Sequence, residues 1–157
     1  AKVSSQEAID QRRVYVTGIS NGSAMAQRFA NEASDIVAAT ASLALYLLVP
    51  KSDTFFPVPM LEIHGTKDSV VNWSSAGAFP GALKNLSTWA AMNKCSGEPV
   101  ESWREGPHYA LTFADCQQGV EVTLVTIHEG GHVIYPSVGS RINTTAMVWD
   151  FMKRFSK

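Results

Sequence analysis

The segment from Arg12 to Ala33 constrains the fold more than any other part of the sequence. A run of β-branched and aromatic residues, Val14 to Thr17, precedes Gly18-Ile19-Ser20-Asn21-Gly22, and an alanine-rich stretch follows. This order predicts a strand, a sharp turn and a helix with Ser20 at the apex, and Gly-x-Ser-x-Gly is the spacing of a nucleophile elbow. We expect glycine at both flanking positions because a side chain there would collide with the neighbouring strand or helix.

The turn also predicts where a negatively charged oxygen would bind. A helix that starts directly after Ser20 leaves backbone N–H groups without intrahelical partners, and the amide of Asn21 is placed to serve as an oxyanion donor. The alternative interpretation is a glycine-rich turn between strand and helix, with Ser20 in a purely structural role.

Composition and charge bound the class of protein. The chain has 157 residues, 45% of them hydrophobic and 17% charged, with a net charge of −1. These values predict a single globular domain over residues 1–157. Because the basic residues are scattered, we expect no nucleic-acid or membrane partner. The apolar run from Leu43 to Val49 ends at Pro50 and falls short of the roughly 20 residues of a membrane span.

Strand and helix patterns alternate along most of the chain. We expect strands at 13–18, 36–44, 58–64 and 120–127, short strands within 99–114, and helices at 22–34, 81–93 and 143–155. Strands that alternate with helices predict an α/β fold with a mostly parallel sheet flanked by helices on both faces.

An acid and a base follow two of the predicted strands. Asp68 comes just after the strand that ends at His64, and His132 follows the last strand in a glycine-rich loop. Because the carboxyl ends of parallel strands share one edge, both should lie near Ser20. A serine needs a base to accept its proton, and the base needs a third group to fix its tautomer.

Each of these residues has a structural alternative. Asp68 could cap its own turn, and His128 competes with His132 for the role of the base. We favour His132 because Gly130 and Gly131 give its backbone freedom to bring the ring over the elbow, whereas His128 sits closer to the strand. His64 is expected to support the Asp68 turn.

Three further residues carry predictions of a different kind. Trp73 follows the acid loop and is a candidate substrate contact, although tryptophan is more often a core residue. On count alone, Cys95 and Cys116 are equally compatible with a disulfide and with two free buried thiols. The Cys and His spacing does not fit a zinc site, and we expect neither a metal nor an organic cofactor.

Three motifs together resemble one known group of enzymes. The motifs are Arg13 to Gly18 with Ser20-Asn21-Gly22, Ile63 to Thr66 with Asp68, and Gly130-Gly131-His132. The chain resembles the polyhydroxybutyrate depolymerase and feruloyl esterase group of secreted α/β-hydrolases. The resemblance extends to Trp89, Asn93 and Cys95 on the helix after the acid loop, and to Trp149-Asp150-Phe151 near the end.

The resemblance implies a role for each residue and a location. Ser20 would be the nucleophile, Asp68 the orienting acid and His132 the base. It also implies a disulfide between Cys95 and Cys116 and export from the cell, to the extracellular space or the periplasm.

Family members usually have a long segment before the elbow, with early strands and a second oxyanion donor. We therefore expect a truncated α/β-hydrolase core in which that donor is not visible. Without earlier neighbours, the Ser20 strand would be an exposed edge, and we expect it to pair with a second copy in a homodimer or with a partner segment.

Taken together, these features predict a serine esterase that hydrolyses carboxylic esters through an acyl-enzyme. Its substrate would be a small-molecule or polymer ester, with short-chain, hydroxyalkanoate or feruloyl acyl groups. One alternative is a truncated, weakly active or inactive hydrolase fragment that acts as a binding or assembly module. Another keeps the fold and takes an acetylated polysaccharide as substrate.

Overall fold

The structure is a computed structural model that describes residues 7–77, 79–135 and 142–157. Its elements, in chain order, are β1 (Val14–Ile19), α1 (Asn21–Glu32), β2 (Val37–Leu43), β3 (Met60–Gly65), α2 (Ala82–Met92), β4 (Val100–Glu105), β5 (His108–Phe113), the 3₁₀ turn η1 (Gln117–Gly119), β6 (Val122–Ile127) and α3 (Thr144–Met152). The strands and helices expected from the sequence are present, with ends that differ by a few residues. The α/β class is confirmed.

The six strands form one sheet in the order β1-β2-β3-β6-β5-β4. β1, β2, β3 and β6 run parallel, whereas β5 is antiparallel to β6 and β4 is antiparallel to β5. The sheet is therefore mixed, and the prediction of a mostly parallel sheet is wrong. The connections explain the difference, because residues 106–107 and 114–121 are too short for the crossover that parallel neighbours need.

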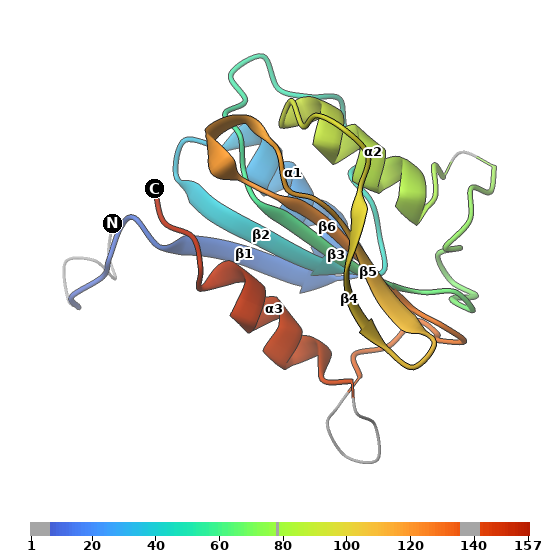
Figure 1. Cartoon of the computed structure of the whole chain (residues 1–157). Helices are drawn as coiled ribbons and strands as arrows, with labels where there is room; N and C mark the ends of the chain where they lie inside the picture. Colours follow the sequence, from blue (N-terminus) through green and yellow to red (C-terminus); the bar gives the residue numbers. More distant parts are fainter. Residues whose placement is uncertain (1–6, 78, 136–141) are drawn as a thin grey trace.

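Helices cover both faces of the sheet, as expected (Figure 1). α1 and α2 pack on one face, where Ala30, Leu86 and Trp89 join a buried cluster. α3 covers the other face, where Val148 and Phe151 join a second cluster. Burial on both faces explains why β2, β3 and β6 consist entirely of buried residues.

The four parallel strands end within two residues of one another at the carboxyl edge of the sheet. Ile19 on β1 is paired with Leu43 on β2, and Leu43 with Ile63 on β3. Gly65 at the end of β3 is paired with Ile127 at the end of β6. The loops that carry Ser20, Asp68 and His132 therefore leave the sheet at this one edge.

β1 is the terminal strand on its side of the sheet in the described part of the chain. At its start, the amide of Lys157 donates to the carbonyl of Arg12 at 2.9 Å, so the C-terminal end lies against the segment before β1 (Figure 1). None of the helices in the described residues combines the length and the apolar character that a membrane span needs.

A disulfide joins Cys95, just after α2, to Cys116, just before η1. The two cysteines are 21 positions apart, so the bond ties the end of α2 to the loop between β5 and β6. Between the two possibilities that the cysteine count left open, the structure has the bonded pair.

Candidate active site

Ser20 occupies the strained turn that the elbow motif requires. Its backbone has φ 55° and ψ −125°, in the left-handed half of φ space that a non-glycine residue rarely adopts. The Ser20 amide donates to the carbonyl of Leu43 at 2.9 Å, which fixes the turn to the end of β2. The sequence-based expectation of a sharp turn at this serine matches the observed backbone.

The two flanking glycines have different roles. A Cβ at Gly18 would lie 2.3 Å from the carbonyl carbon and oxygen of Gly22, so no side chain fits there. A Cβ at Gly22 would meet no atom within 4 Å. The expected collision at Gly22 is therefore wrong: this position supplies the backbone against which Gly18 packs.

Ser20 is also the N-cap of α1, yet its side chain makes no capping hydrogen bond. Its carbonyl accepts from the amides of Ser23 at 2.8 Å and Ala24 at 3.2 Å, which begins the helix. A serine at an N-cap usually uses its hydroxyl on the first turn. Here the hydroxyl is left for other partners, and the amide of Asn21, the first helical residue, has no intrahelical acceptor.

Asp68 is buried, and both of its carboxylate oxygens are used. Oδ1 accepts from the amides of Val70 at 2.9 Å and Val71 at 2.8 Å. Oδ2 lies 2.7 Å from Nδ1 of His132. Asp68 thus stabilises its own turn, as the structural alternative proposed, and also holds the histidine.

His132 is the histidine that the structure brings to Asp68. Because Nδ1 donates to the carboxylate, the neutral ring carries its lone pair on Nε2. The His132 side chain is 17% exposed, whereas that of His128 is 54% exposed and lies 4.0 Å from Glu129. Between the described Ser20 and His132, the structure shows no hydrogen bond.

The acid loop and the histidine loop pack directly on each other. A Cβ at Gly65 would lie 2.2 Å from the carbonyl oxygen of Gly130, and the amide of Lys67 donates to that oxygen at 2.8 Å. Lys67 also forms an ion pair with Glu129. Gly65 therefore permits the close approach of the two backbones. A Cβ at Gly130 would lie 2.4 Å from the Tyr135 hydroxyl, so Gly130 is needed for space, which differs from the conformational freedom expected from the sequence.

A second histidine and a glutamate lie behind Asp68. His64 Nδ1 is 2.8 Å from Glu62 Oε1, and His64 Nε2 is 2.9 Å from the carbonyl oxygen of Val71. The same Nε2 lies 3.5 Å from Asp68 Oδ2. The expected support of the Asp68 turn by His64 matches these contacts, whereas Glu62 was not singled out. Its signal was a charged residue inside an apolar strand.

The surroundings shift the proton affinities of this buried pair. Burial raises the pKa of the Glu62 carboxyl, and hydrogen bonds from His64 and Asn85 offset that rise only in part. Burial alone would lower the pKa of His64, but the hydrogen bond and charge of Glu62 outweigh it and raise the pKa above its ordinary value. Both shifts favour the protonated form of each side chain more than in the unfolded chain.

Trp73 lies beside α2, half-buried against the core. Its indole N–H is buried and has no hydrogen-bond partner within the described residues. The ring lines a shallow hollow of about 330 Å³ together with Ser74, Pro80 and Lys84. This hollow contains none of Ser20, Asp68 and His132, so the role of Trp73 in substrate binding stays a prediction.

Two other hollows lie on the α3 side of the sheet. A small apolar recess of about 230 Å³ is lined by Ile19 and Leu43 at the strand ends, by Ile134 after the histidine loop, and by Val148. It adjoins the elbow, because Ile19 directly precedes Ser20.

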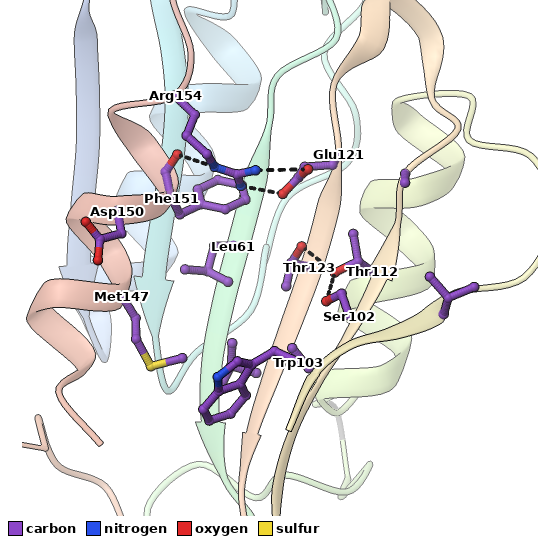
Figure 2. A pocket seen from close by; sticks show the side chains of 14 residues that line it. Leu61, Ser102, Trp103, Thr112, Glu121, Thr123, Met147, Asp150, Phe151 and Arg154 are labelled. Carbon is purple, nitrogen blue, oxygen red and sulfur yellow. Dashed lines mark hydrogen bonds and ion pairs between the residues drawn. The ribbon is translucent and has the colours of Figure 1, made fainter. Parts of the chain in front are cut away.

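The larger hollow, of about 500 Å³, lies between α3 and the strands β3 to β6 (Figure 2). Trp103 lies in it, together with a Glu121–Arg154 ion pair and three hydroxyls linked through Thr112. None of Ser20, Asp68 and His132 lines this hollow. Across the described ranges, we find no group of three or more His, Cys, Asp or Glu side chains arranged to hold a metal ion.

The fold and the site together define an α/β protein with a serine on a strained elbow and an aspartate–histidine pair at the same sheet edge. This is the set of groups that a serine hydrolase uses. The chain is 31% identical to feruloyl esterase B of Piromyces equi over 169 aligned positions, which cover 99% of this chain and 30% of that protein.

Two further relatives carry related names. The bifunctional acetylxylan esterase/xylanase XynS20E of Neocallimastix patriciarum is 27% identical over 94% of this chain and 21% of its own length. The putative esterase NocK of Nocardia uniformis subsp. tsuyamanensis is 26% identical over 79% of this chain and 43% of its own length. Esterase names therefore recur among the relatives, and the chain spans less than half the length of each. No model of a known protein family matches the chain.

Proposed function

We propose that this chain is a carboxylic-ester hydrolase in which Ser20 is the nucleophile, His132 the general base and Asp68 the orienting acid. The observation that carries the proposal is the 2.7 Å hydrogen bond from His132 Nδ1 to Asp68 Oδ2. It occurs at the sheet edge where the elbow presents a serine hydroxyl that the helix does not use.

The reaction follows from the roles of these groups. Ser20 Oγ attacks the ester carbonyl while His132 Nε2 accepts its proton, and Asp68 stabilises the imidazolium that forms. The Asn21 amide donates to the oxyanion of the tetrahedral intermediate. His132 then returns the proton to the leaving alcohol, and water hydrolyses the acyl-enzyme by the same steps in reverse order.

The substrate is proposed as an ester of a short-chain, feruloyl or hydroxyalkanoate acid, in a small molecule or a polymer. The names feruloyl esterase and acetylxylan esterase among the relatives support the first two of these. The apolar recess beside the elbow supports an apolar acyl group, because Ile19, Leu43 and Val148 line it. The hydroxyalkanoate class rests only on the resemblance of the motifs to the α/β-hydrolase group.

The deciding experiment compares the unmodified chain with Ser20→Ala on p-nitrophenyl acetate and butyrate. We expect Ser20→Ala to abolish turnover. Ser87→Ala is the matched control, because Ser87 is exposed on α2 and its hydroxyl bonds only to the Lys84 carbonyl in the described structure. Equal turnover by the wild type and Ser20→Ala would contradict the proposal and support a binding or assembly module instead.

Substrate class is then assigned by parallel assays on methyl ferulate, acetylated xylan and poly-3-hydroxybutyrate. The Cys95–Cys116 disulfide supports a further proposal, that the protein works outside the cytoplasm. Disulfides form and persist chiefly in oxidising compartments.

A further inference from the structure

The buried polar residues behind Asp68 form a network that the proposed reaction does not use. Glu62 and His64 lie two positions apart on β3, and their residues are 0% and 1% exposed. Side chains two positions apart share one face of a strand. That face is turned toward α1 and α2, because Met60 packs in the cluster beneath those helices.

Contacts to groups that can only donate fix the orientation of this network. Asn85 Oδ1 accepts from the amide of Leu47 at 3.1 Å, so its Nδ2 must face Glu62 Oε2, at 2.5 Å, and Gln27 Oε1, at 3.0 Å. Gln27 Oε1 also accepts from the indole N–H of Trp89 at 2.8 Å. An indole N–H and a backbone N–H have no acceptor role, so neither amide can flip without losing a buried bond.

The orientation of Glu62 in turn fixes His64. With Oε2 taken by Asn85, Glu62 Oε1 meets His64 Nδ1 at 2.8 Å. On the other side of the ring, Nε2 faces the carbonyl of Val71 at 2.9 Å. A carbonyl oxygen can only accept, so Nε2 carries a hydrogen, and a carboxylate at Nδ1 favours a hydrogen there as well.

Two imidazoles therefore flank one carboxylate oxygen. Asp68 Oδ2 lies 2.7 Å from His132 Nδ1 and 3.5 Å from His64 Nε2. We propose that Glu62 and His64 form a buried ion pair whose imidazolium holds and polarises the Asp68 carboxylate on which His132 is oriented. Both are positioning residues, since they act through Asp68. The kinetic consequence rests on the proposed ester hydrolysis, whereas the ion pair itself does not.

The charged and titratable groups around His64 set the sign of the effect. Glu62 and Asp68 face its two ring nitrogens, and Tyr46 stacks on the ring at 5.3 Å between centroids. Burial raises the pKa of Tyr46, so that ring stays neutral at ordinary pH. A positive His64 offsets part of the negative charge that Asp68 presents to His132. Loss of that positive charge should therefore increase the negative potential that Asp68 presents to His132.

Glu62→Gln tests the ion pair with little change of shape. The new carboxamide still accepts from Asn85 and can donate to the Nδ1 of a neutral His64. We expect the acid limb of kcat/KM to move upward by roughly one pH unit. We expect kcat to fall by about tenfold, a part of the 10²–10⁴ that a positioned general base supplies, with KM unchanged.

Asn93→Ala is the matched control for a buried amide. Asn93 caps α2, is fully buried, and bonds through both side-chain atoms to Val58, away from His64. We expect it to lower the melting temperature without moving the acid limb. If the acid limb of kcat/KM does not move in Glu62→Gln, or if it moves equally in both variants, the positioning role is overturned.

Nuclear magnetic resonance of isotope-labelled histidines separates this inference from the proposed function. In the unmodified chain, His64 should stay doubly protonated from about pH 5 to 8, the range in which an ordinary histidine titrates. In Glu62→Gln, His64 should be neutral over most of that range.

These spectra need no turnover. If the wild type lacks Ser20-dependent hydrolysis but shows this pattern, the ion pair stands and the proposed function fails. A singly protonated His64 in an active wild type would overturn the ion pair and leave the proposed function intact.

Discussion

At the scale of single residues, Gly18 and Gly22 look alike in the sequence but should respond differently to substitution. For Gly18→Ala, we expect a loss of about 1–3 kcal/mol in unfolding free energy, because the new methyl group would lie 2.3 Å from the Gly22 carbonyl. Gly22→Ala, which places its methyl group in open space on α1, should stay within about 1 kcal/mol of the wild type. Urea unfolding of the two variants measures the difference.

The same two variants should also differ in ester hydrolysis. Gly18→Ala should depress ester hydrolysis, because the only relief for its methyl group is movement of the turn that carries Ser20. Similar unfolding free energies for the two variants would show that the Gly18–Gly22 contact does not constrain the turn.

The hydrogen bond between Asp68 and His132 gives a second residue-scale prediction. Asp68→Asn can keep an oxygen toward the amides of Val70 and Val71, but it places an N–H₂ group against His132 Nδ1. The imidazole is then driven to the tautomer with its hydrogen on Nε2, which cannot accept a proton from Ser20. In a well-studied serine protease the equivalent change costs about 10⁴ in rate.

We expect a loss of similar size for Asp68→Asn in p-nitrophenyl butyrate hydrolysis, with the circular dichroism spectrum unchanged. His128→Ala is the comparison variant, because His128 is exposed and makes no contact with Asp68 in the described structure. If His128→Ala loses as much activity as Asp68→Asn, the choice of His132 as the base is wrong.

At the scale of elements, the disulfide fixes the end of α2 to the hairpin side of the sheet. Cys95 and Cys116 are 21 positions apart, and a loop of that length corresponds to about 3 kcal/mol in the chain-entropy model. We expect the double variant Cys95→Ala, Cys116→Ala to lose an unfolding free energy of that order, measured by urea unfolding. Reductant should destabilise the wild type and leave the double variant unaffected.

The same experiment tests whether the bond has a role in the candidate site. Asp68 and His132 are held by the acid loop and the histidine loop, which pack on each other through Gly65 and Gly130. Ester hydrolysis well below the unfolding midpoint should therefore be equal in the double variant and the wild type. A strong loss of activity in the folded double variant would place the disulfide in the support of the site.

At the scale of the whole molecule, the sequence predicted the local parts of the site well. Short segments of sequence encode the elbow, the order of the strands along the chain, and the loops that carry Asp68 and His132. Their local patterns were therefore sufficient to predict them. The mixed sheet was missed because strand direction depends on how short connections close in three dimensions. Residues 106–107 allow only a hairpin between β4 and β5.

Glu62 was missed for a related reason. Its neighbours Gln27 and Asn85 come from α1 and α2, far away in the sequence, and only packing brings them to β3. From the sequence alone, a glutamate in an apolar strand has no visible partner. The cost of burying an unpaired charge is the physical reason to look for one.

The free side of β1 gives the last prediction at this scale. β1 ends the sheet in the described structure, so the N–H and C=O groups on that side have no strand partner. Apolar side chains are exposed on both helices that flank β1: Met25 and Phe29 on α1, and Trp149 on α3. Trp149 lies beside the strand, since its ring contacts that of Tyr15 at 6.2 Å between centroids.

A strand edge bordered by exposed apolar residues is suited to pair with the same edge of a second copy. We expect sedimentation velocity to show a dimer that forms as the concentration rises, and Thr17→Lys, a charge on an exposed β1 residue, to shift it to monomer. Leu83→Lys adds the same charge to the exposed side of α2 and should leave the dimer intact. A wild type that sediments as a monomer at every concentration would exclude pairing between copies through β1.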